Sequence, residues 1–73
     1  MTPATLAAAG EALYGPFWQT DLARDLGVNR RTVARWRSGQ NPMPDGLAED
    51  LWELMASRAE AIEMVMARVR REG

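Results

Sequence analysis

The sequence predicts an all-α fold, a small helical domain whose last helix is much longer than the others. Three observations lead to this prediction. Apolar residues recur at intervals of three and four, which is typical of amphipathic helices. Glycine and proline interrupt the pattern at 15–16, 27 and 39–44, which separates three short helices from the rest. Beyond residue 45 the apolar pattern continues without a breaker to about residue 71.

Length and composition exclude several classes of function. A chain of 73 residues has room for one domain and buries only a modest share of its surface. Without cysteine it has no disulfide, so association with another copy is the common remaining way to add buried surface. Without cysteine and histidine, most nucleophile–base pairs and transition-metal sites are excluded. We therefore expect no enzyme activity, no metal and no cofactor, and no small-molecule ligand is evident.

The sequence also argues against a membrane protein. It contains no run of about 18 apolar residues. Its start, Met1-Thr2-Pro3, lacks the basic and apolar regions of a signal peptide. We therefore expect a cytoplasmic protein that can reach the nucleoid.

The first helix is expected at residues 2–14. Thr2 is a suitable N-cap and Pro3 is favoured at the first helical position. Gly10 within the helix costs about 1 kcal/mol relative to alanine, so we expect either that another backbone approaches closely there or that the helix is weaker than its alanines suggest. Gly15 and the proline after it end the helix.

The second helix is expected at residues 19–26, with Phe17 and Trp18 packing on the core before it. Gly27 supplies the left-handed residue that stops a helix. The spacing of the apolar residues gives the helix one buried face, formed by Leu22, Ala23 and Leu26.

The third helix is expected at residues 29–37, with Asn29 as its N-cap. Val28 is expected to fill the core just before it. Val33 and Trp36, three positions apart, point inward. The residues left largely outward are Arg30, Arg31, Ala34, Arg35 and Arg37.

The fourth helix is expected at residues 45–71, after a loop rich in glycine, proline and polar residues at 38–44. Such a helix is roughly 40 Å long, so no partner within a chain of this size can cover it. Any bend is expected at Ser57-Arg58. One apolar stripe, suited to the core, contains Leu47, Leu51 and Leu54. A second stripe has coiled-coil spacing and is expected to form a dimer interface: Trp52, Met55, Ala59, Ile62, Met66 and Val69. The alternative is that this second stripe is intramolecular core.

The net charge of −1 conceals a polarised chain. Residues 19–39 contain five arginines and two aspartates, 5 − 2 = +3, whereas residues 40–73 contain four arginines and seven acids, 4 − 7 = −3. A local basic patch, rather than the total charge, is what binds phosphate. The first of these two stretches is therefore the candidate surface for nucleic acid.

The segment 19–36 resembles the helix-turn-helix of the lambda repressor and Cro family. Glutamine stands at the first position of the motif (Gln19), alanine at the fifth (Ala23) and glycine at the ninth (Gly27). The remaining apolar positions of the motif are Leu22, Leu26, Val28, Val33 and Trp36. Two departures are a tryptophan before the second helix, where a capping residue is usual, and one long C-terminal helix in place of two short ones. The family's dimer arrangement is therefore not carried over.

The resemblance implies that the third helix enters the major groove of double-stranded DNA. Arg30, Arg31 and Arg35 are then the candidate base contacts, since arginine pairs with guanine through two hydrogen bonds. The candidate DNA backbone contacts are Gln19, Thr32, Arg37, Gln40 and Asn41. The structural alternatives are a solvated arginine face, and turn roles for Gln40 and Asn41. Trp18 and Trp36 are expected in the core rather than stacked on bases.

These observations predict a transcriptional regulator, a homodimeric repressor that reads an inverted-repeat operator. The resemblance also suggests an origin in a phage or mobile element. The alternative is a protein-interaction module, such as an antitoxin or an adaptor, whose C-terminal helix binds a different chain.

Overall fold

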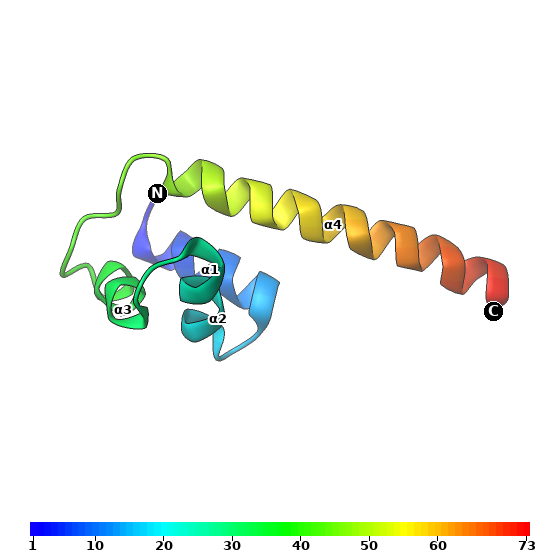
Figure 1. Ribbon diagram of the computed structural model, residues 1–73, viewed down its shortest axis with the longest axis horizontal. Helices are drawn as coiled ribbons and strands as arrows, with labels where there is room; N and C mark the ends of the chain where they lie inside the picture. The colour runs from blue at the N-terminus through cyan, green and yellow to red at the C-terminus, as the bar shows by residue number, and fades with distance from the viewer.

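The computed structural model describes residues 1–73 and is all-helical, which confirms the predicted fold class. Its helices are α1 (Pro3–Tyr14), α2 (Trp18–Leu26), α3 (Arg30–Ser38) and α4 (Leu47–Glu72). Helices α1, α2 and α3 pack together, α1 packs against the first half of α4, and the second half of α4 projects away from them (Figure 1). We call residues 3–58 the globular part and residues 59–73 the tail. The tail makes the molecule elongated, 48 Å along its longest axis and 22 and 21 Å across.

The predicted helix ends near the N-terminus and at the turn between α2 and α3 are confirmed. The Thr2 hydroxyl accepts a hydrogen bond from the Thr5 amide at 3.1 Å, and Pro3 begins α1. Gly27 adopts the left-handed conformation, φ 72°, in which a Cβ is unfavourable, and its amide closes α2. Asn29 Oδ1 accepts the Arg31 amide at 2.8 Å and so caps α3. These local signals depend only on neighbouring residues.

Four predicted boundaries were wrong by one or two residues. Helix α2 begins at Trp18 instead of Gln19, and α3 ends at Ser38 instead of Arg37. Helix α4 begins at Leu47 instead of Asp45, because Gly46 has φ 89° and cannot belong to a right-handed helix. Beyond that point α4 is one helix that is uninterrupted at Ser57-Arg58 and ends at Glu72, one residue later than predicted.

The core takes one fully buried side chain from each helix. These are Leu6 of α1, Leu22 of α2, Val33 of α3 and Leu51 of α4. Further buried side chains surround them, among them Trp18, Trp36 and Leu47. Trp18 and Trp36 therefore belong to the core, as expected. The first three helices therefore pack on one another, and α4 joins the globular part mainly through α1.

Two residues expected in the core lie outside it. Phe17 is 88% exposed and Val28 is also exposed. Only one of the two adjacent aromatic residues fits beneath α1, and that is Trp18. Its indole lies against Gly10 so closely that a Cβ at that position would overlap the ring. The close approach expected at Gly10 therefore exists, but a side chain makes it.

Arg58 marks the end of the globular part along α4. Its Nη1 donates a hydrogen bond to the Leu13 carbonyl at 2.8 Å, and its guanidinium lies 5.6 Å from the centre of the Tyr14 ring. The end of α1 therefore reaches as far as this residue. Every residue of α4 beyond Arg58 is exposed. None of the four helices has both the length and the apolar character needed to cross a membrane.

Candidate nucleic-acid interface

The candidate interface is the outward face of α3. Val33 and Trp36 are 0% and 6% exposed and fix the inner side of this helix against the core. Because an α-helix turns by about 100° per residue, the positions opposite this pair are those of Arg31 and Arg35. Both side chains are exposed. Buried residues thus position two of the three arginines predicted as base contacts.

The turn before α3 fixes the angle at which this face is presented. Ala23 is almost completely buried, and its carbonyl accepts the Val28 amide at 2.9 Å. The Gly27 amide donates to the Arg24 carbonyl at 3.2 Å. The small side chain at Ala23 allows the two helices to pack closely, as the sequence pattern requires. The turn that leads into α3 is therefore fixed to the end of α2 by backbone hydrogen bonds, and α3 itself is held by its core residues.

The arginines of α3 have no acidic partner. Arg30, Arg31, Arg35 and Arg37 are all exposed, and none takes part in an ion pair. The two aspartates of this stretch instead surround Arg24, whose Nη1 lies 3.1 Å from Asp21 and whose Nε lies 3.2 Å from Asp25. The charge of +3 therefore divides into four positive charges on α3 and one net negative charge around Arg24. Helix α3 presents uncompensated positive charge to solvent.

The start of α2 lies beside α3. Gln19 and Arg30 line the same shallow hollow, together with Phe17 and Thr20. No side chain caps the N-terminus of α2, so amides of its first turn remain free in this region. Free amides at a helix N-terminus favour an anion, and the nearby guanidinium adds to this preference. The structure thus brings together one predicted base contact and one predicted backbone contact.

The predicted contacts after α3 lie in a loop that closes that helix. The Asn41 amide donates to the Arg35 carbonyl at 3.2 Å, and the Gln40 amide to Ser38 Oγ at 3.3 Å. The side chains of Gln40 and Asn41 are exposed, whereas Thr32 is half-buried. Asn41 lines a different hollow, shared with Trp36 and the N-terminal residues. The loop residues are therefore not grouped with Gln19 and Arg30.

A polar cluster around Tyr14 joins α1 to Asp25 of α2 and Arg58 of α4. The Tyr14 hydroxyl donates to Asp25 Oδ2 at 2.6 Å. Partial burial, and then this hydrogen bond to a carboxylate, raise the pKa of Tyr14 from 10.0 to about 12. The same hydrogen bond, with one from Arg24, lowers the pKa of Asp25 below its usual value. This cluster stabilises the junction of helices and presents no free cation to a ligand.

The predicted dimer stripe is divided by the fold. Met55 is half-buried and packs against the core, so it belongs to the globular part. Trp52 is 67% exposed. The remaining members lie on the exposed tail: Ala59, Ile62, Met66 and Val69.

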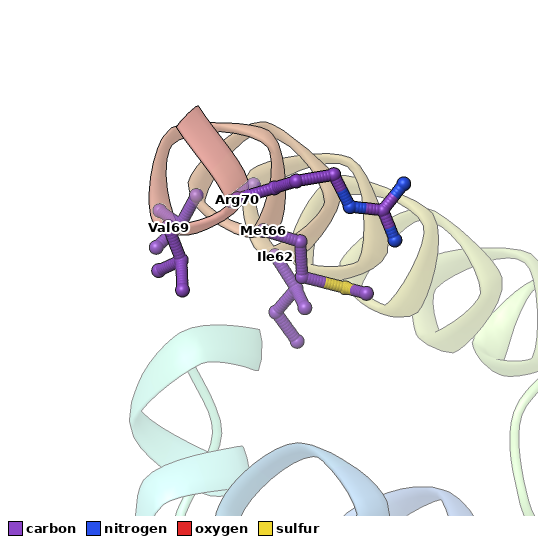
Figure 2. Close-up of a pocket in the computed structure, with 6 residues that line it drawn as sticks. Ile62, Met66, Val69 and Arg70 are labelled. Atoms are coloured by element: carbon purple, nitrogen blue, oxygen red, sulfur yellow. The ribbon is translucent and has the colours of Figure 1, made fainter. Parts of the chain in front are cut away.

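An apolar groove runs along one side of the tail. Figure 2 shows Ile62, Met66 and Val69 projecting from the same side of α4, with the aliphatic stem of Arg70 beside Met66. Ala61 and Val65 also line this groove, and the predicted stripe omitted both. The full lining extends from Ala61 to Arg70 on one helix, with no other element covering it.

No group of three or more acidic side chains is arranged to hold a metal ion.

No family model matches this chain, and no curated protein or solved structure is significantly similar to it. The function must therefore be inferred from the structure, chiefly from α3, its surroundings and the tail.

Proposed function

We propose that this chain is a sequence-specific DNA-binding protein that places α3 in the major groove of double-stranded DNA. The observation that carries the proposal is the set of exposed, unpaired arginines on a helix whose other side is fixed by Val33 and Trp36. Arginine presents a planar fork of donors that matches guanine O6 and N7, and also phosphate. The resemblance of residues 19–36 to the helix-turn-helix of the lambda repressor and Cro family supports the same proposal.

The residues divide into two roles. Arg31 and Arg35 are the proposed base readers, because they are four positions apart and opposite the buried side of α3. Arg30 reads an edge base or a phosphate, since it shares a hollow with Gln19 at the free N-terminus of α2. The other proposed DNA backbone contacts are Thr32, Arg37, Gln40 and Asn41.

We further propose that the protein acts as a homodimeric transcriptional regulator. Two copies that pair through their tails present two α3 helices to an inverted-repeat operator, with half-sites separated by one helical turn of DNA, about 34 Å, or by a multiple of it. Such a dimer represses most simply by occupying the site. The proposed pairing surface includes Ala59, Ile62, Met66 and Val69, while Met55 is already packed within its own chain.

A second candidate function is a protein-interaction module, such as an antitoxin or an adaptor. The exposed apolar tail favours it, because an uncovered apolar face of this kind marks an interaction site. Sedimentation of the purified chain discriminates between the two. A reversible dimer supports the homodimeric regulator, whereas a monomer or an aggregate supports the module that needs a different chain.

Selection of bound duplexes from a random DNA pool tests the main proposal. We expect a palindromic consensus whose half-sites contain guanine. Affinity for the selected duplex should fall steeply with salt, because arginine–phosphate contacts release counterions. Recovery of no sequence above the starting pool would contradict specific DNA binding.

A single substitution then tests the role of Arg35. Arg35→Ala should weaken binding to the selected duplex by about 1–3 kcal/mol, measured by fluorescence anisotropy, and relax one base position in a repeated selection. Arg68→Ala removes an exposed arginine outside the proposed DNA interface and serves as the matched control. An equal loss on random and selected DNA would make Arg35 a phosphate contact instead of a base reader.

A further inference from the structure

The apolar face of the tail continues the face of α4 that the globular part covers. Leu47, Leu51 and Leu54 contribute to the core, and the same line along the helix runs through Arg58 to Ile62, Val65 and Val69. The steps between these residues are 4, 3, 4, 4, 3 and 4, close to 3.67 residues per turn, which keeps the line nearly straight along an α-helix. This line therefore joins the first stripe expected from the sequence to Ile62 and Val69 of the second.

This stripe is covered up to Arg58 and open beyond it. The last intramolecular contacts along it are those of Arg58 with Leu13 and Tyr14. Past that point the large apolar side chains of the stripe, from Ile62 to Val69, are 51% to 64% exposed. A row of three such side chains, with the exposed Met66 beside it, is more than scattered surface residues explain.

We propose that a second copy of the chain covers this face, with the two tails antiparallel. The position of the globular part sets the direction. A parallel partner laid on the same face would bring its own residues 47–58 into the space that α1 and the core already fill. An antiparallel partner needs only the tail, residues 59–73, and ends where the globular part begins. The overlap is about 22 Å long.

The charges of the tail agree with this direction. Full overlap of residues 59–73 puts the two-fold axis near Val65 and Met66, since these lie at the middle of the tail. Glu63 of one copy then lies near Arg70 of the second copy, on the same edge of the apolar face. Neither residue has an ion-pair partner within its own chain. A parallel pair in register would instead set like charges at the same level.

The same register brings Ile62 beside Val69 of the second copy. This inference rests on the pairing of tails proposed above and adds its direction and register. It does not depend on DNA binding. The interface is small, so we expect a reversible dimer with a dissociation constant in the micromolar range.

Engineered cysteines test the direction, because the chain contains none. Ile62→Cys and Val69→Cys are made separately in the full chain, and each is oxidised alone and as an equal mixture. In the antiparallel arrangement the two different variants approach within disulfide distance, whereas two identical variants are separated by seven residues, about 10 Å along the helix. We expect a cross-linked dimer from the mixture and little from either variant alone.

Every other outcome overturns the proposal. Efficient cross-linking of each variant with itself would indicate parallel tails. No cross-linking in the mixture would mean that the tails do not pair in this register, whether or not the native chain sediments as a dimer. The substituted positions are exposed on the tail, and circular dichroism checks that each variant keeps its helices.

A charge exchange tests the register independently. Glu63→Arg should weaken self-association at least fivefold in sedimentation equilibrium, and adding Arg70→Glu to it should restore most of the affinity. A double variant as weak as Glu63→Arg would overturn the proposed pair. Ile62→Asp should abolish dimerisation while a duplex with one half-site still binds. Failure of self-association can thus be distinguished from failure of DNA binding.

Discussion

Helix α4 contains two regions that have the same apolar pattern and opposite surroundings. Within the globular part, Leu47 and Leu51 are almost completely buried. Within the tail, Ile62 and Val69 occupy the same side of the same helix and are mostly exposed. The pattern therefore identifies an apolar face but does not say what covers it. In this chain the cover is α1 and its neighbours for half of the helix, and nothing within the chain for the other half.

The two regions also differ in how their charges are held. Near the junction, Arg58 and Asp25 bond to neighbouring helices through Leu13 and Tyr14. In the tail the one ion pair is Arg68 with Glu72, whose atoms are 3.9 Å apart and well exposed. Charges in the globular part thus fix the fold, whereas most tail charges remain available to another molecule.

The largest expected effect compares one buried and one exposed side chain of this face. Leu51→Ala should lower the free energy of unfolding by about 2–5 kcal/mol, because it leaves a cavity in the core. Ile62→Ala should change it by less than about 0.5 kcal/mol at low protein concentration, because the side chain has no partner within the chain. Urea denaturation followed by circular dichroism measures both. Equal losses would mean that the tail folds back on the globular part.

The same two variants should behave differently as the protein concentration rises. If tails pair, the wild-type unfolding midpoint rises with concentration, because dimerisation stabilises the native state. Ile62→Ala should lose most of this dependence, and Leu51→Ala should keep it. A midpoint independent of concentration in the wild-type chain would argue against pairing of the tails.

The helix ends were largely predictable because their signals are local. A capping side chain such as Thr2 or Asn29, or a glycine such as Gly27, determines a boundary through its own backbone and its nearest amides. The start of α4 was predicted two residues early, because Asp45 is a good residue for a first turn. Gly46, between Asp45 and Leu47, has a left-handed backbone conformation, so the helix cannot include Asp45.

The exposure of Phe17 could not be predicted from composition, because Phe17 and Trp18 are both large and apolar. Helical spacing did carry a signal, since Trp18 lies four residues before the buried Leu22 and Phe17 does not. The missing Cβ at Gly10 was a second signal, because it leaves room for one ring. Tertiary packing decided between two neighbours of equal hydrophobicity.

The candidate site was predictable in part. The exposure of Arg31 and Arg35 follows from the spacing of Val33 and Trp36, which the sequence contains. The shared hollow of Gln19 and Arg30 required the three-dimensional packing of α2 on α3. Val65 was missed because coiled-coil spacing passes over it, whereas the straight line through Leu51 and Leu54 includes it.

An intermediate effect is expected at the junction between the two regions. Arg58→Met should lower the free energy of unfolding by about 1–2 kcal/mol, because it removes a charged hydrogen bond to Leu13 and the contact with the Tyr14 ring. Arg68→Met, the matched control in the tail, should change it by less than about 0.5 kcal/mol. Thermal unfolding measures both. Equal effects would mean that Arg58 adds nothing to the junction.

The smallest expected effect is a pH dependence confined to the globular part. Tyr14 is the only tyrosine, so the absorbance of its phenolate reports on this residue alone. We expect a titration midpoint of about 12 in the folded protein, and a lower one in Asp25→Asn, where the carboxylate acceptor is absent. A midpoint near the ordinary 10.0 in the folded wild-type chain would contradict the hydrogen bond.

The direction of the stability change follows from these pKa shifts. Between pH 10 and 12 the folded state keeps the Tyr14 proton while the unfolded state loses it, so stability falls as pH rises through this window. At the acid end the lowered pKa of Asp25 gives stability that is present above its ordinary value of 3.8 and is lost as pH falls below it. Self-association should respond differently, since the tail contains no tyrosine and its proposed pairing uses Glu63 and Arg70. Loss of dimer between pH 10 and 12 without loss of helical signal would therefore show that the junction and the tail are coupled.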